Sequence, residues 1–514
     1  MKRRLIRWSS VAAVLMTVAS AATAEAETCA LQIKRLESAT ARTTGPPTDQ
    51  MFRGMYPQRF FRQTGLEIAG RPGADDEAEF AKVITKEPAS YNSKSPFRAV
   101  AKLGTQQFGF VIDSRKAEEA AAEPAKDAAK QPAKEAVAKP ARPVPALPAY
   151  GRLLFDVNHN GDLTDDPVIE AQTTPERGFP AGYLSFSFPR VDLTVEADGT
   201  KIDFAFTVDG YGHSQVLNEN QTYQYVSVSL NAAAYREGEI TLDGKQTRIV
   251  VTDYNSNGRF DDLWAIDDSI SLSDGTVYPR QGDVLFVDPQ AAQGGLYGYD
   301  PTMNDVQQFV AKAVQIGGRF YTLRITPAGD TLTLEPSPLA VGQVSNPNRG
   351  YRALVYGDLG ILKVNGDAEG RAPLPVGSWK LLMYTIDRTG IQDPAQPAAK
   401  EPSLLQSLAN ALLQREPASG PTIVSARAKR DCPAIEVKPG ETAELRFGAP
   451  YRAEVTASGP IPPGGTVSLG LALVGVGGEV CSNLMVAGQR PDKPQFTITD
   501  PDGKVIQQGS FEYG

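Results

Sequence analysis

Short apolar runs separated by turn residues follow one another along most of the chain. The runs at 108–113, 152–157, 223–230 and 248–254 are typical: each is rich in β-branched and aromatic residues, and Gly, Asn, Asp or Pro lie nearby. A helical spacing of leucines is clear only at 403–416. The pattern therefore predicts a mostly β protein.

Two segments interrupt this pattern. Residues 115–149 are mainly Ala, Lys, Glu and Pro, and a segment with so little to bury cannot offset the entropy lost on ordering. We expect a disordered insert there. Strand-like runs lie on both sides of it, so it is predicted to be a long hairpin loop, which the weak dependence of loop-closure entropy on length allows. Residues 392–421 are predicted to be a second insert, which contains the short helix at 403–416.

The first 26 residues have the features of an export signal. A basic start is followed by a short Ala-rich apolar run and by the small residues of a cleavage site at 24–26. Removal of 1–26 takes away four basic residues and one acidic residue, so the net charge changes from −8 to −11. No later segment is long and apolar enough for a membrane helix. We therefore expect an exported protein, in the periplasm, at the cell envelope or outside the cell.

The charge limits the classes of partner that we expect, and the cysteines limit the possible disulfides. An acidic exported protein is a poor candidate for binding nucleic acid or an anionic membrane. It is a reasonable candidate for binding cations. An exported compartment permits disulfides. Cys432 and Cys481 could pair and leave Cys29 unpaired, or all three could be isolated thiols.

The sequence contains one polar motif twice. DVNHNGDLTDD occupies 156–166, and DYNSNGRFDD occupies 253–262. Aligned on the first aspartate, both have Asp at position one, Asn at positions three and five, Gly at position six, an apolar residue at position eight and Asp at position ten. Each copy follows a strand-like run. The repetition predicts a repeated β-sheet unit with a loop inserted in each copy.

The spacing fits a loop that binds a hard cation. Ca²⁺ prefers about six to eight oxygen ligands. Side chains at alternate positions of a tight loop can converge on one centre, and the glycine allows the turn that brings the next carbonyl around. The apolar residue at position eight anchors the loop to the core. We therefore predict one calcium ion in each loop; magnesium fits less well because it requires a more regular geometry.

The motif resembles the calcium loop of EF-hands and, more closely, the Asp- and Asn-rich loops of dockerins. At position twelve, where an EF-hand has a bidentate Glu, this chain has Pro167 and Trp264. The aspartates at position ten are the expected replacements, with Asp166 as a further option. The resemblance implies the ligands Asp156, Asn158, Asn160, the carbonyl of Asp162, Thr164 and Asp165 in the first copy, and Asp253, Asn255, Asn257, the carbonyl of Arg259, Asp261 and Asp262 in the second.

A plain turn is the alternative interpretation. Asn-Gly is the strongest two-residue hairpin signal, so Asn160–Gly161 and Asn257–Gly258 could each be a type I′ turn with solvated aspartates around it. Matching Asp and Asn residues at alternate positions of two loops are more than a turn requires. This favours the calcium interpretation.

The character of the sequence changes near residue 350. The turns PVGSW at 375–379 and VKPGET at 437–442 resemble those of immunoglobulin-like and carboxypeptidase-regulatory-like modules. The resemblance implies a C-terminal β-sandwich of the immunoglobulin type. The predicted division of the mature chain is a β-rich region at 27–215 with the first loop, a β-rich repeat at 216–345 with the second loop, and the sandwich at 346–514.

Residues suited to catalysis are scarce. The chain has only two histidines. His159 lies inside the first motif, and His213 precedes Ser214, but neighbours in a strand point to opposite faces. No motif for zinc catalysis, thiol redox chemistry or phosphate binding occurs.

The expected function is that of a non-catalytic calcium-binding structural or interaction protein. Its partner would be an unknown protein or a polysaccharide. One alternative is a secreted hydrolase, such as a glycoside hydrolase with two close carboxylates in a cleft. The other is a carbohydrate-binding protein with a planar row of exposed aromatics. Candidate aromatics for such a row are Tyr223, Tyr225, Trp264, Tyr297 and Tyr299. Packing in the core is the more ordinary interpretation of aromatics at strand spacing.

Overall fold

A computed structural model of the chain describes residues 26–36, 52–64, 76–115, 147–172, 182–218, 221–271, 275–289, 301–389, 420–458 and 467–513. Within these ranges the secondary structure is one helix, α1 (Asp76–Val83), and otherwise β-strands. The predicted mostly β fold is therefore confirmed. The export signal, the helix at 403–416 and most of the two predicted inserts lie outside the described residues, as do Tyr297 and Tyr299.

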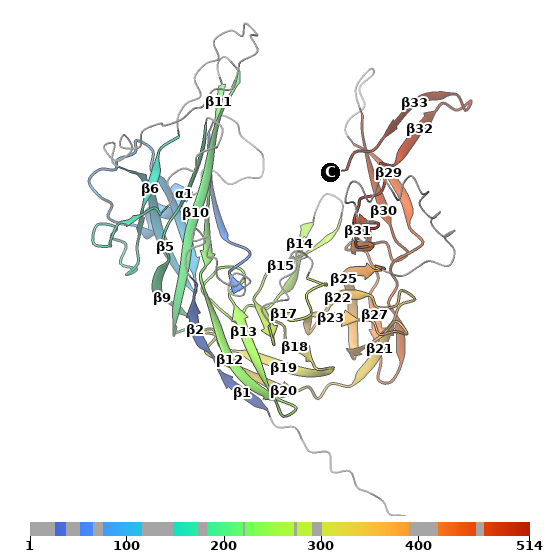
Figure 1. Cartoon of the computed structure of the whole chain (residues 1–514). Helices are drawn as coiled ribbons and strands as arrows, with labels where there is room; N and C mark the ends of the chain where they lie inside the picture. The colour runs from blue at the N-terminus through green and yellow to red at the C-terminus, as the bar shows by residue number, and fades with distance from the viewer. Residues whose placement is uncertain are drawn as a thin grey trace, which may run out of the picture.

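Four antiparallel sheets surround the largest apolar core, which contains residues between Cys29 and Leu334. The long strands β10 (Thr200–Asn218) and β11 (Gln221–Ala232) extend along the left arm of the molecule in Figure 1. The first sheet has the order β4 (Phe97–Leu103), β5 (Gln106–Ser114), β6 (Tyr150–Phe155), β7 (Ile169–Glu170). The second has the order β3 (Gln58–Thr64), β11 (Gln221–Ala232), β10 (Thr200–Asn218), β8 (Tyr183–Ser187), with β9 (Val191–Ala197) also paired to β10.

The other two sheets close the base of this core. One has the order β17 (Gln307–Phe309), β16 (Val284–Val287), β13 (Lys245–Thr252), β12 (Ala234–Leu242), β2 (Gln32–Arg35). The other has the order β1 (Glu27–Ala30), β20 (Thr331–Pro336), β19 (Arg319–Ile325), β18 (Ala313–Ile316). The N-terminal strands β1 and β2 thus pair with strands from the middle of the chain.

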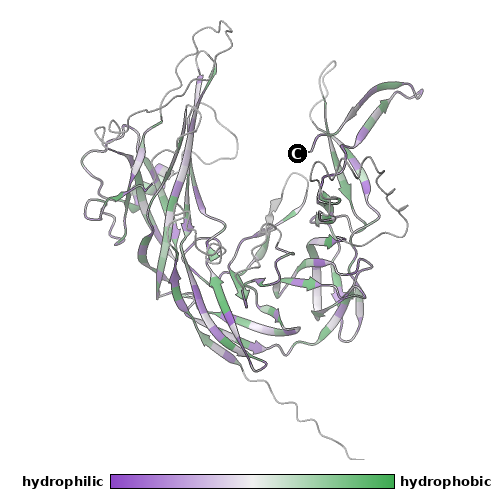
Figure 2. Cartoon of the chain, in the orientation of Figure 1, coloured by the Kyte–Doolittle hydropathy of each residue, from purple (hydrophilic) through white to green (hydrophobic). Residues whose placement is uncertain are grey.

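Alternation along the strands explains why this sequence forms sheets. In β9 the apolar Val191, Leu193 and Val195 are buried and the polar residues between them are exposed. Because side chains alternate between the two faces of a strand, such a sequence can bury one face only. Hydrophobic and hydrophilic residues alternate along many other strands as well (Figure 2).

The C-terminal part has a second core and a larger sheet. Its order is β23 (Gly360–Asn365), β22 (Arg352–Gly357), β25 (Gly377–Asp387), β26 (Ile423–Arg427), β31 (Val480–Met485), β30 (Ser468–Val474), β29 (Arg452–Ser458), with β27 (Ile435–Val437) also paired to β25. A three-stranded sheet has the order β24 (Arg371–Pro375), β21 (Val341–Ser345), β28 (Thr442–Glu444). Two hairpins complete the described strands: β14 (Ala265–Ser271) with β15 (Val277–Arg280), and β32 (Gln495–Thr499) with β33 (Val505–Ser510).

The expected region boundaries fall inside shared structure. The boundary between residues 215 and 216 lies within β10, and the largest core takes residues from both sides of it. The boundary between 345 and 346 follows β21, which pairs with strands of the C-terminal part. A further apolar cluster joins Phe52 and Phe286 to Leu354 and Leu382, so the N-terminal and C-terminal parts pack against each other.

Strand pairing agrees with the predicted hairpin around 115–149, because β5 and β6 pair in antiparallel fashion. The thiols of Cys29, Cys432 and Cys481 form no disulfide. Among the described residues, no helix is sufficiently long and apolar to traverse a bilayer.

Candidate metal centre

Both predicted loops leave the end of a buried strand. Loop 1 (156–166) follows β6, and loop 2 (253–262) follows β13. Strand β6 pairs with β5, and β13 pairs with β12, so each loop sits at the end of an antiparallel pair. At position eight, Leu163 and Phe260 are buried. An apolar side chain thus anchors each loop to the core, as the sequence predicted.

The first aspartate of each loop is buried and holds the loop closed. Asp156 is 1% exposed and Asp253 is 0% exposed. The backbone N–H groups of Asn160 and Gly161 donate to the two carboxylate oxygens of Asp156, both at 3.0 Å. In loop 2 the N–H groups at positions five and six donate to Asp253 in the same way, at 3.1 and 2.7 Å. Such local bonds from side chain to backbone fix a compact loop in place of a sheet ladder.

The backbone of both loops differs from that of a two-residue hairpin. The residues at position four are left-handed, with φ of 58° at His159 and 60° at Ser256, and the glycines at position six have φ of 76° and 81°. Asn160 and Asn257 are not among the described residues with positive φ. A type I′ turn needs positive φ at both central residues. The two Asn-Gly pairs are therefore not type I′ turns.

In loop 1 the asparagines at positions three and five turn toward position ten. The Nδ2 atoms of Asn158 and Asn160 donate to the two carboxylate oxygens of Asp165, at 3.3 and 2.8 Å. Asn158 Oδ1 accepts the backbone N–H of Asn160 at 3.1 Å. With Asp156, the structure thus brings together four of the six residues predicted as ligands in loop 1.

Loop 2 repeats this arrangement. The Nδ2 atoms of Asn255 and Asn257 both donate to Oδ2 of Asp262. Asn255 Nδ2 also donates to the carbonyl of Gln281 at 3.3 Å, whereas its Oδ1 is buried and accepts no hydrogen bond from the described residues. Buried polar atoms nearly always have a partner. A cation bound beside this oxygen would supply one.

The side chains at positions seven and nine are engaged elsewhere. Asp162 accepts the backbone N–H and the hydroxyl of Thr164 at 2.8 and 2.5 Å, and it accepts Lys86 Nζ at 2.6 Å. In loop 2, Arg259 donates two bonds of 3.0 Å to the carboxylate of Asp261. The structure therefore leaves Thr164 and Asp261 outside the groups of four. The predicted ligands at position seven are the main-chain carbonyls of Asp162 and Arg259, and these side-chain contacts do not occupy them.

Loop 1 concentrates negative charge at its closed end. Burial, with the added repulsion of Asp156 and Asp165, raises the pKa of Asp166 to about 6. Its Oδ2 is buried and has no hydrogen-bond partner among the described residues. At the opposite side, hydrogen bonds from Lys86 and Thr164 lower the pKa of Asp162 to about 2.

Loop 2 includes an acid that the sequence reasoning missed. Asp283, which precedes β16, is fully buried and accepts the backbone N–H groups of Tyr254 and Asp262 at 3.1 and 2.8 Å. Burial, then the nearby carboxylates of Asp253 and Asp262, raise the pKa of Asp283 well above its usual value. Burial also raises the pKa of Asp253 to about 7, against the lowering effect of the backbone N–H groups that it accepts. The only feature of the sequence that marks Asp283 is its place directly before an apolar strand.

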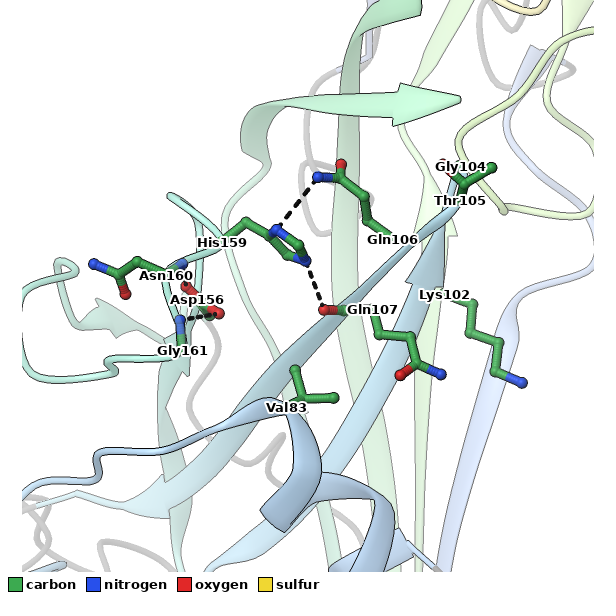
Figure 3. A pocket seen from close by; sticks show the side chains of 10 residues that line it. All are labelled: Val83, Lys102, Gly104, Thr105, Gln106, Gln107, Asp156, His159, Asn160 and Gly161. Atoms are coloured by element: carbon green, nitrogen blue, oxygen red, sulfur yellow. Dashed lines mark hydrogen bonds between the residues drawn. The ribbon is translucent and has the colours of Figure 1, made fainter. Parts of the chain in front are cut away.

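The β4–β5 hairpin contacts both loops. Gly104, in the turn between β4 and β5, donates its N–H to the carbonyl of Asn257 in loop 2 at 2.6 Å. From the other side, the His159 ring of loop 1 contacts the side chain of Gln106 and the carbonyl of Gln107, at 3.3 and 3.1 Å (Figure 3). These residues border an open cavity of about 640 Å³ beside loop 1. The two loops therefore belong to one packed unit.

The catalytic candidates do not form a catalytic group. His159 contacts the start of β5, and His213 stacks on Tyr183. Ser214 is buried and accepts a bond of 3.5 Å from Gln224. Across the described ranges there is no group of three or more His, Cys, Asp and Glu side chains placed to hold a metal ion. The donors gathered in the loops are instead a mixed set of carboxylate and amide oxygens.

Comparisons of the chain with protein families, with curated proteins and with solved structures found no match.

Proposed function

We propose that this chain is an exported, non-catalytic structural or interaction protein in which each loop binds one calcium ion. The observation that carries the proposal is the repeated geometry. In both loops a buried aspartate, two asparagines and a second aspartate converge in the same way. A plain turn gives no reason for two loops with the same four side chains in the same arrangement.

The chemistry of the donor set supports calcium. Its donors are oxygens of carboxylate, amide and carbonyl groups, which hard cations prefer. The buried Oδ1 of Asn255 is an oxygen ligand that accepts no hydrogen bond from the described residues. The Oδ1 atoms of Asn158, Asn160 and Asn257 each accept one backbone N–H, at 3.1, 2.7 and 3.0 Å. An amide oxygen has two lone pairs, so each keeps one for a cation.

The proposed role of the ion is structural. Each ion would neutralise an acidic loop and would bind the folded chain only, which stabilises the fold by mass action. Two neutral amides among the ligands keep the ligand charge low, so we expect a dissociation constant of roughly 10⁻⁴–10⁻³ M, the range of extracellular modules. A nanomolar constant in calorimetric titration would contradict this expectation. We propose in addition that the loops mark two copies of a β-sheet unit and that the C-terminal part is an immunoglobulin-like sandwich.

Thermal unfolding tests the proposal. The wild-type protein and the double variant Asp156→Ala/Asp253→Ala are unfolded in calcium-free buffer and in 10 mM calcium, a concentration of about 10 to 100 times the expected dissociation constant. We expect calcium to raise the midpoint of the wild-type protein by at least about 2 °C and to leave that of the double variant unchanged. Magnesium at the same concentration should have a smaller effect.

A matched control separates binding in the loops from general screening of an acidic protein. The variant Asp358→Ala/Asp502→Ala removes the same charge from two exposed turns outside the loops. It should respond to calcium as the wild-type protein does. An equal response of the loop variant and the wild-type protein would overturn the proposal.

A further inference from the structure

One face of the sheet β3–β11–β10–β8 carries a group of aromatic rings. Residues such as Phe60, Val226 and Val228 place the opposite face of this sheet in the largest core. Because side chains alternate along a strand, the residues between them lie on the other face. There Tyr183 of β8 pairs with His213 of β10, and His213 pairs with Tyr225 of β11. Aromatic rings thus occupy one row across three strands.

The rings form a continuous track. The ring centroids of Tyr183 and His213 are 5.3 Å apart, and those of His213 and Tyr223 are also 5.3 Å apart. Tyr225 lies 5.8 Å from Tyr211 and 6.5 Å from Tyr223. Tyr183 and Tyr211 are 50% and 52% exposed, whereas Tyr225 is 7% exposed. Tyr225 is therefore the base of the track, and Tyr183 and Tyr211 are its outer contacts.

Uncharged polar side chains lie between the rings. Gln63 pairs with Tyr225, Ser185 and Ser227 flank Tyr211, and Gln215 pairs with Tyr223. In these paired rows of the described sheet, no residue is a Lys, Arg, Asp or Glu. Gln63 Oε1 is buried and accepts no hydrogen bond from the described residues. The track, consisting of Tyr183, Tyr211, His213, Tyr223 and Tyr225, thus combines aromatic rings with uncharged hydrogen-bonding groups. The next row of the same face contains one base, Arg59, and one acid, Asp209, so charged side chains begin at one end of the track.

We propose that this aromatic track binds a neutral glycan chain. A pyranose ring has an apolar C–H face, which packs on an aromatic ring, and a rim of hydroxyl groups, which bond to amide and hydroxyl side chains. An anionic polymer would need basic residues, and the rows of the track contain no Lys or Arg. Since the track is longer than one sugar ring, its ligand is an oligosaccharide or a polysaccharide. The inference is independent of calcium binding in the loops.

Isothermal titration calorimetry of the full chain with a panel of hexaoses tests the inference. The panel is cellohexaose, xylohexaose, maltohexaose and chitohexaose, with polygalacturonate as the anionic comparison. We expect at least one neutral hexaose to bind and polygalacturonate not to bind. The double variant Tyr183→Ala/Tyr211→Ala should weaken the binding of that hexaose at least about tenfold, because the two most exposed rings of the track are lost.

Three controls make the result specific. Tyr211→Phe keeps the ring and should bind the hexaose within about twofold of the wild-type protein. Tyr513→Ala removes an exposed tyrosine far from the track in sequence, in the C-terminal segment, and should have no effect. The midpoint of thermal unfolding of the double variant should stay within about 2 °C of the wild-type value, since both side chains are half exposed; if it falls further, Tyr183→Ala alone on β8 replaces the double variant.

Several outcomes would overturn the inference. Binding of no neutral hexaose, or binding that the tyrosine variants leave unchanged, would exclude a glycan site on this face. Sedimentation of the protein without glycan tests the other occupant, a second copy of the chain. If the wild-type protein self-associates and the double variant does not, the track is an interface between copies and not a glycan site.

Discussion

Loop 1 and loop 2 share a motif and a set of inner hydrogen bonds, but their surroundings differ. Loop 1 lies open at its middle, where Asn158, His159 and Asn160 are exposed. In loop 2 the residue at position four, Ser256, is buried, and both asparagines are half-buried. The same ten-residue pattern thus folds alike at an exposed site and at a buried one.

The difference lies in the charge that each loop must accommodate. Loop 2 includes the fully buried carboxylates of Asp253 and Asp283, with Asp262 beside them. Loop 1 has one fully buried carboxylate at its centre, Asp156, and the partly exposed Asp166. A buried charge is costly unless it is paired. The motif therefore determines the local geometry, and the surroundings determine how strongly the loop needs a cation.

The largest effect that we expect from this difference is on stability in calcium. In 10 mM calcium, Asp253→Ala should lower the free energy of unfolding by about 3 kcal/mol and Asp156→Ala by about 2 kcal/mol. Each variant loses one proposed ion and the acceptor of two backbone N–H groups. The larger loss belongs to loop 2, because Asp283 and Asp262 there remain without a counter-charge.

Denaturant unfolding of the two single variants, with and without calcium, measures this difference. The exposed-turn variant Asp358→Ala is the control for the loss of one charge. A larger effect of Asp156→Ala than of Asp253→Ala would contradict the account of loop 2 as the site with the greater need for a cation.

The second effect concerns pH. A carboxyl group whose pKa is raised in the folded state favours folding in its protonated form, so its contribution is complete below about pH 4 and is lost as the pH rises through its folded pKa. For Asp166 and Asp253 those values are about 6 and about 7. In calcium-free buffer these groups should therefore reduce stability between pH 5 and pH 8. Calcium competes with the protons, so its stabilising effect should increase over the same range.

Denaturant unfolding at pH 5.5 and pH 8.0 checks the sign. We expect the stability gained from 10 mM calcium to be at least about 1 kcal/mol greater at pH 8.0. In Asp253→Ala most of this pH dependence should disappear, whereas Asp156→Ala, which leaves the acids of loop 2 in place, should retain it. Equal gains at the two pH values in the wild-type protein would show that protons do not compete with calcium for these carboxyl groups.

The sequence allowed the local part of each loop to be predicted because the motif is local. The apolar anchor at position eight and the aspartate at position ten both follow from spacing within ten residues. Leu163 and Phe260 are buried, and Asp165 and Asp262 each receive both asparagines. Alternation along the strands likewise sufficed for the mostly β fold.

The surroundings of the loops could not be predicted in this way. Asp283 lies 30 residues after Asp253 in the sequence. The pairing of β13 with β16 brings it to loop 2. The β4–β5 hairpin contacts loop 2 through Gly104 and loop 1 through Gln107. The expected boundary at residue 215 fell inside β10 for the same reason, since sequence patterns indicate strands but not which strands pair.

The smallest effect that we expect on the free energy of unfolding comes from position four of the loops. It depends on what surrounds each loop and not on the shared motif. His159 and Ser256 occupy position four of loop 1 and loop 2, with φ of 58° and 60°. Alanine at either position therefore meets the same left-handed backbone, and the strain cancels when the two variants are compared. Their contacts differ: Ser256 Oγ is buried and accepts the N–H of Ala232 at 3.0 Å, whereas the His159 ring is exposed.

Ser256→Ala should accordingly lower the free energy of unfolding by about 1–2 kcal/mol, because the buried N–H of Ala232 loses its acceptor. His159→Ala should cost less, about 0.5–1 kcal/mol, because water replaces the two hydrogen bonds of the ring and only its contact with the Phe108 ring is lost. Denaturant unfolding in calcium-free buffer compares the two without any contribution from metal. Ser256→Gly and His159→Gly, which relieve the left-handed strain, should preserve the difference between the loops. Equal costs in both pairs would mean that the two loops are equivalent in their packing as well as in their motif.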